Sequence, residues 1–175
     1  MMKLSAFLAA EQKAVVERWF EAVLSDYPAE TAGFLRKETD QFANPVGFRL
    51  RTGLNEIFQE LLQPQISEKI NKPLIQLLKI RAVQDFSPSK AVGFLLLLKP
   101  ITRELWVQKV QREIPWEEWG EFEARIDAVT LMAFDHYSDS REQLYRIRIK
   151  ELKNSIPRIY RDATVRTCTG SLSER

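Results

Sequence analysis

A helix break followed at once by a continuous apolar run constrains this chain more than any other feature. Within residues 80–99, Ser87 stands where a helix cap is expected, and Pro88 occupies the first turn, where its missing N–H is not needed. Residues 91–98 then contain no charged or polar side chain. Such a run has to be buried on almost every side. The segment therefore predicts a polar elbow fixed against a core helix.

Arg81 and Asp85 precede this elbow and stand four residues apart. That spacing puts two side chains on one face of a helix, so we expect them to form an ion pair. The pair serves either as a structural tie between helices or as the polar part of a ligand pocket. Phe86 and Phe94 would line such a pocket, although core packing accounts for most of the aromatic residues in a helical domain.

The rest of the chain has the apolar spacing of helices separated by prolines. Glycines are few, six in 175 residues, and no long repeat is present. The expected helices cover residues 4–24, 31–36, 46 to about 64, 66–86 with Pro73 as a kink or restart, 88 to about 112 with a bend at Pro100, and 115–157 with a break near 138–140. The fold class is therefore all-α, a single-domain helical bundle over residues 1–156 with a flexible, basic and polar tail over 157–175.

The third of these helices has the clearest start signal. Asn44 is the expected cap and Pro45 the first helical residue. Gly47 and Gly53 lie inside the helix, where glycine lowers intrinsic helicity. We interpret them as places where another helix comes close.

Charge and composition exclude several classes of function. The net charge of +2 gives no support to a general nucleic-acid role. Residues 141–166 hold eight Lys or Arg and three acids, a local charge of +5, which fits either a solvated helix face or contact with an acidic partner or membrane surface. Cys168 is the single cysteine and allows no intrachain disulfide. No apolar run approaches the ~20 residues of a membrane span, so we expect a cytoplasmic protein.

Residues that carry chemistry are scarce. His136 is the only histidine, and it lies in a polar stretch with no nucleophile motif to accompany it. The acids nearby, Glu123, Asp127 and Asp135, fit a helix surface better than a metal site. No glycine-rich phosphate loop is present. We expect no enzyme, no catalytic residue, no metal and no cofactor.

Three segments together resemble a known family. They are residues 40–47 (DQFANPVG), residues 80–94 (IRAVQDFSPSKAVGF), and residues 134–137 (FDHY) with 141–145 (REQLY). This set resembles the RsbRD N-terminal domain family, named for a co-antagonist protein of the bacterial stressosome pathway, and the likeness covers roughly residues 5–152. The resemblance implies an all-helical, globin-like sensory module without haem, of the kind that precedes a histidine kinase or a regulatory output domain. Because the chain ends soon after Pro157, it leaves no room for such a domain, and we expect a standalone member that acts through a partner.

Two functional hypotheses follow. The first is a non-enzymatic sensory or regulatory module that binds a signalling partner or a second copy of itself along the last helix, with the candidate interface Phe122, Ile126, Val129, Tyr137 and Leu144. The second is a carrier or sensor of a small apolar or fatty-acyl ligand in an internal pocket. Its candidate ligand or motif residues are Asn44, Pro45, Gly47, Arg81, Asp85, Phe86, Ser87 and Phe94, with Arg81 as an anion anchor. A third reading, a basic helix that binds nucleic acid or membrane, is weakened by Glu142 and Glu151.

Overall fold

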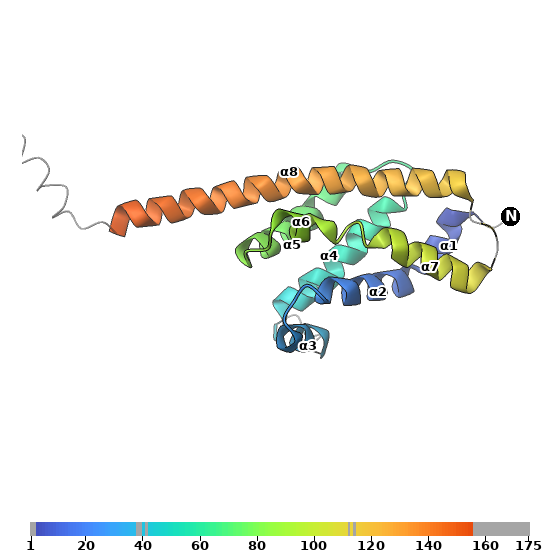
Figure 1. The fold of residues 1–175 in the computed structure, drawn as a ribbon, viewed down its shortest axis with the longest axis horizontal. Coiled ribbons are helices and arrows are strands. Elements are labelled where there is room, and N and C mark those ends of the chain that lie inside the picture. The colour runs from blue at the N-terminus through green and yellow to red at the C-terminus, as the bar shows by residue number, and fades with distance from the viewer. Residues whose placement is uncertain (1–2, 38–39, 41, 112, 114, 156–175) are drawn as a thin grey trace, which may run out of the picture. The chain divides into compact units, whose positions relative to one another are not determined.

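Every regular element that the structure describes is a helix (Figure 1). The structure is a computed structural model that describes residues 3–37, 40, 42–111, 113 and 115–155. It confirms the all-α fold class. The chain divides into two units, Met1–Ser140 and Arg141–Arg175. The expected tail, residues 157–175, lies outside the described residues.

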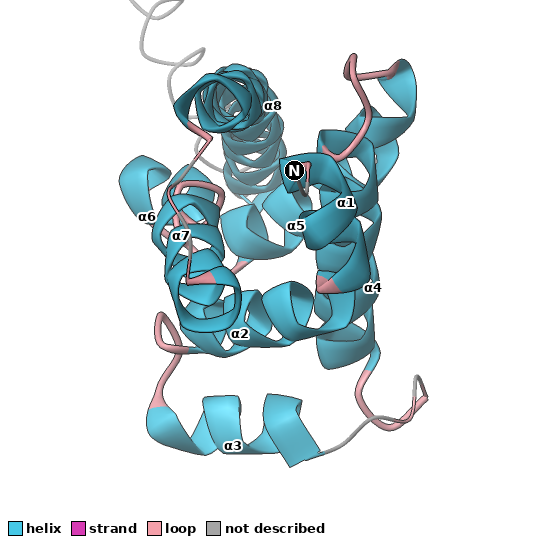
Figure 2. Cartoon of the chain, turned by 90° about the vertical axis from the view of Figure 1, so that its right-hand side faces the viewer, coloured by secondary structure: helices cyan, strands magenta, loops and turns pink. Residues whose placement is uncertain are grey.

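The first unit is a helical bundle around one hydrophobic core. In chain order its elements are α1 (Leu4–Ala10), α2 (Gln12–Leu24), α3 (Ala29–Lys37), α4 (Pro45–Leu61), the 3-10 turn η1 (Glu68–Ile70), α5 (Asn71–Val83), α6 (Pro88–Gly93), α7 (Leu98–Val110) and the start of α8 (Trp116–Ser155). α4 packs against both α2 and α5, and α2 also packs against α7. Figure 2 shows α3 outside this arrangement, across α2 from the α5 and α8 side.

α4 begins as its sequence predicts. The side-chain Oδ1 of Asn44 accepts a hydrogen bond from the Gly47 backbone N–H at 2.8 Å, and Pro45 is the first helical residue. The Asn44 Nδ2 donates to the Leu35 carbonyl at 3.3 Å, so the cap also ties the end of α3 to α4. A Cβ added at Gly47 would meet this Asn44 side chain. Position 47 therefore requires glycine because the Asn44 side chain lies close to it. The predicted approach of another helix at Gly47 is wrong.

Two of the expected long helices are interrupted. The segment 4–24 divides at Glu11, whose φ of −97° and ψ of 10° separate α1 from α2. The segment 66–86 becomes η1 and α5, with Pro73 in the first turn of α5, so this proline restarts a helix and does not kink one. α3 is longer than expected, because it begins directly after Pro28.

The expected helix 88–112 is also two helices. Its break falls at residues 94–97 and not at Pro100, which lies in the first turn of α7. Pro100 offers no N–H and crowds the carbonyl four residues earlier, so the chain before it tightens into three-residue turns such as Leu98 N–H to Leu95 C=O. Leu96 consequently points outward, 42% exposed, whereas Phe94, Leu95 and Leu98 stay buried as predicted.

A tryptophan fills the gap that this break leaves in the hydrogen-bond ladder. In an uninterrupted helix the Phe94 carbonyl would accept from the Leu98 N–H, but that N–H bonds to Leu95. The indole Nε1 of Trp19 donates to the Phe94 carbonyl instead, at 2.6 Å and fully buried. The two rings stack with centroids 5.8 Å apart. α2 therefore holds the broken helix both by polar and by aromatic contact.

α8 shows no break at the predicted place. Ser138 and Ser140 continue the helix, and their hydroxyls donate to the carbonyls four residues earlier, of Phe134 at 2.9 Å and His136 at 2.8 Å. Serine therefore satisfies its polar group inside the helix and does not end it. The predicted break is wrong for the backbone, although the first unit does end at Ser140.

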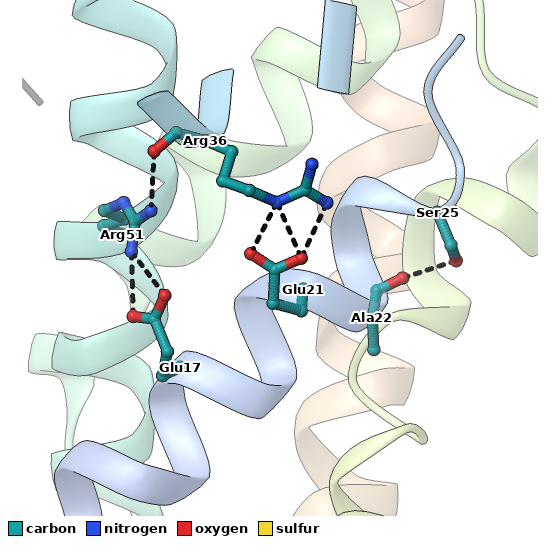
Figure 3. A network of polar contacts seen from close by, with 6 residues as sticks. All are labelled: Glu17, Glu21, Ala22, Ser25, Arg36 and Arg51. Carbon is teal, nitrogen blue, oxygen red and sulfur yellow. Dashed lines mark hydrogen bonds and ion pairs between the residues drawn. The ribbon is translucent and has the colours of Figure 1, made fainter. Parts of the chain in front are cut away.

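An ion pair and a hydrogen bond to its backbone connect α3 with α2 and α4 (Figure 3). Arg36 of α3 bonds to Glu21 of α2 through both Nε and Nη2, and Arg51 of α4 bonds to Glu17 of α2 and to the Arg36 carbonyl. The hydrogen bond and the charge of Arg36 lower the pKa of Glu21. These pairs lie at the surface, where ion pairs are screened by solvent and contribute little to stability.

The two glycines Gly53 and Gly120 provide a matched test of helix packing. A Cβ at Gly53 would lie 3.0 Å from Leu77 Cγ of α5, whereas a Cβ at Gly120 in α8 would meet nothing within 4 Å. We expect Gly53→Ala to lower the free energy of unfolding by about 1–2 kcal/mol through overpacking. Gly120→Ala should raise it by about 0.5–1 kcal/mol through helix propensity. Urea unfolding of both variants measures this, and a stabilised Gly53→Ala protein would contradict the close α4–α5 approach.

Candidate functional site

The elbow between α5 and α6 is a helix end followed by a capped restart. α5 ends at Val83, and Asp85 takes a left-handed conformation with φ 59°. The Asp85 N–H bonds to the Ala82 carbonyl and the Phe86 N–H to the Arg81 carbonyl, each at 3.2 Å. This is the Schellman pattern, in which two otherwise free carbonyls at a helix end receive donors. Asp85 therefore lies outside the helix, and the prediction that it shares a helical face with Arg81 is wrong.

Arg81 is the buried centre of the site. Its side chain is 1% exposed, and its Nη1 donates to Asp26 Oδ2 at 3.2 Å and to the Lys90 carbonyl at 2.7 Å. The guanidinium lies over two rings, 5.0 Å from the centroid of Phe86 and 4.8 Å from that of Phe94. It therefore connects the end of α2, the last turn of α5 and α6. Its Nη2 is buried and makes no hydrogen bond within the described residues.

A pocket of about 520 Å³ opens to solvent beside this centre. It carries both charge signs and two aromatic rings, and its walls are Asp26, Tyr27, Pro28, Thr31, Gln84, Asp85, Phe86, Ser87 and Lys90. The Tyr27 hydroxyl donates to Gln84 Oε1 at 2.9 Å, and its ring contacts that of Phe86 at 5.4 Å. The pocket is thus an amphipathic surface hollow formed by the α2–α3 turn and the elbow.

Tyr137 of α8 makes a hydrogen bond to the elbow. The Tyr137 hydroxyl donates to the Phe86 carbonyl, and the Tyr137 side chain is 1% exposed. The Phe86 ring at the same time borders the pocket and covers Arg81. One residue of the elbow therefore connects the pocket, the buried guanidinium and α8.

The structure divides the predicted ligand residues into three groups. Arg81, Asp85, Phe86 and Ser87 come together at the elbow, and Asp85, Phe86 and Ser87 line the pocket. Phe94 contacts Arg81 from the core side and is closed off by Trp19, so it does not line the pocket. Asn44, Pro45 and Gly47 form the α4 cap and are absent from the pocket walls.

Ser87 occupies the predicted cap position before Pro88, but its side chain makes no capping bond and instead lies 3.3 Å from the Ser89 hydroxyl.

The predicted interface residues are mostly core residues. Phe122, Ile126, Val129 and Tyr137 are each at most 1% exposed in the first unit. Their seam packs inside the bundle, so it is not a surface for a partner. Leu144, in the second unit, is half-buried. His136 is a structural residue, with its Nε2 3.2 Å from Asn71 Oδ1.

Sequence reasoning missed the residues that complete the site. Asp26, Tyr27 and Lys90 join Arg81 from the turn after α2 and from α6, and only the tertiary fold brings them together. The charge of Asp26, two residues before Pro28, gave no local signal. Sequence reasoning also missed an exposed apolar set on α8, which consists of Tyr145, Ile149 and Leu152. Their spacing of four and three residues is the signal that could have identified them.

Within the described ranges, no three His, Cys, Asp or Glu side chains are grouped so as to hold a metal ion. Among the same residues, no helix combines the length and the apolarity that crossing a bilayer requires.

The first unit is thus an all-helical domain with a buried arginine at its polar elbow. The chain matches the family described as the RsbT co-antagonist protein rsbRD N-terminal domain over residues 13–152, and it belongs to that family. The resemblance noted in the sequence is thereby confirmed. No curated protein and no solved structure matches the chain. The family places the chain among regulatory domains, and the globin-like detail stays a prediction.

Substitution of Arg81 tests whether the elbow depends on the guanidinium. Arg81→Ala leaves a cavity beside the rings of Phe86 and Phe94. It also removes the hydrogen-bond donor to Asp26 and to the Lys90 carbonyl, so we expect the free energy of unfolding to fall by about 3 kcal/mol. Arg81→Met keeps much of the packing and should lose about 1–2 kcal/mol. Urea unfolding monitored by circular dichroism separates the two. A loss below about 0.5 kcal/mol for Arg81→Ala would contradict a central role.

Tyr27 makes the stability of the folded protein depend on pH in the alkaline range. Burial raises the pKa of Tyr27, with Asp26 adding to the rise and Arg81 opposing it. Because the raised pKa belongs to the folded state, the stability that Tyr27 contributes is complete below the ordinary tyrosine pKa of about 10 and is lost as the pH rises through the higher folded value. Tyr27→Phe should therefore show a shallower fall in stability above pH ~10, together with a loss of about 1 kcal/mol at neutral pH from the Gln84 bond. Parallel slopes for the two proteins would refute it.

Proposed function

We propose that this protein is a cytoplasmic, non-enzymatic sensory module that regulates a signalling partner by direct contact. The observation that carries the proposal is membership of the rsbRD N-terminal domain family over most of the chain. The family is named for a co-antagonist, which is a protein that acts together with another protein to oppose a target protein. A regulatory domain needs a place that responds to a signal and a surface that passes the response on.

The elbow and α8 support this division of tasks. Tyr137 of α8 donates its hydroxyl to the Phe86 carbonyl, and Phe86 also borders the pocket and covers Arg81. A change in the pocket that moves Phe86 would break or weaken this bond. Because α8 supplies buried residues to the core of the first unit, including Trp119, Phe122 and Ile126, such a change would also alter the packing of the helix.

A small-molecule sensor is the second candidate, and the pocket beside Arg81 favours it. An internal fatty-acyl cavity lined by Phe94 gains no support, because the Phe94 ring is 2% exposed, stacks with Trp19 and lies under the Arg81 guanidinium. The solvent-open pocket instead presents Tyr27 and Phe86 with Asp26 and Lys90 around them. A compact ligand with an aromatic or apolar body and polar ends fits these walls better than an acyl chain.

Two neighbouring hydroxyls of α8 supply a matched test of the regulatory proposal. Tyr137→Phe removes the hydroxyl that reaches the elbow, whereas Ser138→Ala removes one that donates to the Phe134 carbonyl on the same helix. In the native host, deletion of the gene should change transcription of stress-regulated genes. We expect the wild-type protein and Ser138→Ala to restore normal transcription and Tyr137→Phe to fail.

The stability of each variant has to be measured beside its signalling. Tyr137→Phe should lose only about 1 kcal/mol in the free energy of unfolding and remain folded, which circular dichroism and urea unfolding check. A tagged full-length chain should also copurify with a regulatory protein that binds it again from purified components. Unchanged transcription after deletion, together with the absence of any reconstituted complex, would rule out the proposed function.

A further inference from the structure

The second unit carries an exposed apolar stripe on a helix. Tyr145, Ile149 and Leu152 of α8 are separated by four and then three residues, the spacing of a seam between two packed helices. All three are exposed, at 47%, 51% and 66%. The stripe covers about two helical turns within residues 141–155, which are the described part of this unit.

Basic residues flank the stripe on both sides. With Ile149 at heptad position a, and Tyr145 and Leu152 at d, the e positions are Arg146 and Lys153, and the g positions are Arg141, Arg148 and Ser155. Four of these five flanking positions are therefore Lys or Arg. Glu142 occupies the preceding a position, in line with the stripe, and pairs with Arg146 at 2.7 Å.

This pattern opposes pairing of the stripe with a second copy of itself. In a parallel pair the g residue of one helix faces the e residue of the next heptad in the other, which brings Arg148 to Lys153 and Arg141 to Arg146. In an antiparallel pair g faces g and e faces e. Both arrangements place like charges together across the seam, and like charges at such positions are unfavourable.

We propose that this stripe is the docking surface for an acidic amphipathic helix of a partner protein. The apolar seam supplies burial, and the basic flanks select Glu and Asp at the facing e and g positions of the partner. The proposal rests on the proposed function, because it gives the chemistry of the partner that a regulatory module would contact. It also replaces the expectation of a homodimer along the last helix with a heterotypic contact.

Synthetic peptides test this surface without knowledge of the natural partner. One helical peptide of about three heptads carries Ile at a, Leu at d and Glu at e and g, and a second differs only in having Lys at e and g. Binding of each labelled peptide to the full-length chain is measured by fluorescence anisotropy at low salt. We expect the acidic peptide to bind at least about tenfold more tightly, with the difference shrinking at about 0.5 M salt.

The helix offers matched control positions for both parts of the surface. Ile149→Asp should abolish binding, whereas Ile147→Asp makes the same change at an equally exposed isoleucine nearly opposite on the helix and should not. The double variant Arg148→Glu with Lys153→Glu should reverse the preference toward the basic peptide. Lys150→Glu changes the charge by the same kind of substitution outside the flanks and should preserve the preference.

Several results would overturn the proposal. They are equal binding of the two peptides, equal effects of Ile147→Asp and Ile149→Asp, or self-association of the chain in sedimentation that Ile149→Asp removes. Binding to vesicles with about 30% anionic lipid that depends on Ile149, without any peptide preference, would assign the stripe to a membrane surface and refute it as well. The proposed function would survive each of these if a reconstituted regulatory partner still bound the Ile149→Asp protein.

Discussion

The first unit depends on how one buried arginine is accommodated. Arg81 is surrounded by two aromatic rings, one carboxylate and one backbone carbonyl, and these come from the turn after α2, from the elbow, and from α6 and the residue that follows it. A guanidinium without such partners would be expelled or would unfold its surroundings. The elbow therefore has to close in one way, with Phe86 over the guanidinium. That placement in turn presents the Phe86 carbonyl to Tyr137 of α8.

The second constraint is the broken helix at residues 94–97. Pro100 prevents a regular helix across this segment, and the Phe94 carbonyl is left for the indole of Trp19. The apolar run that constrained the sequence most is thus buried except at Leu96 and, in part, at Gly93 and Leu97, and it forms the end of one helix, a set of tight turns and the start of another. The Phe94 ring stacks with Trp19 and also lies under the Arg81 guanidinium, so the core and the elbow share this ring.

Local signals in the sequence were sufficient for the fold class, for the Asn44 cap and for the restart at Pro88. They failed where a tertiary partner decides the outcome. Nothing within a few residues of Arg81 indicates Asp26, and Asp85 at a left-handed position, usually taken by glycine, gives no clear end signal. The seam Phe122–Ile126–Val129 was identified correctly as apolar, but periodicity cannot tell a core seam from an exposed one. Ser138 and Ser140 suggested a helix break because the sequence does not show that their hydroxyls donate to backbone carbonyls of the same helix.

The separation of charge and apolar surface on the second unit has a kinetic consequence. Attraction between the basic flanks and an acidic helix acts at a distance and governs how quickly the two meet, so the association rate is set by ionic strength. Burial of Ile149 and Leu152 acts only after contact and governs how long the complex lasts. A rise in cellular salt would therefore slow recruitment of the partner while leaving the lifetime of complexes already formed nearly unchanged.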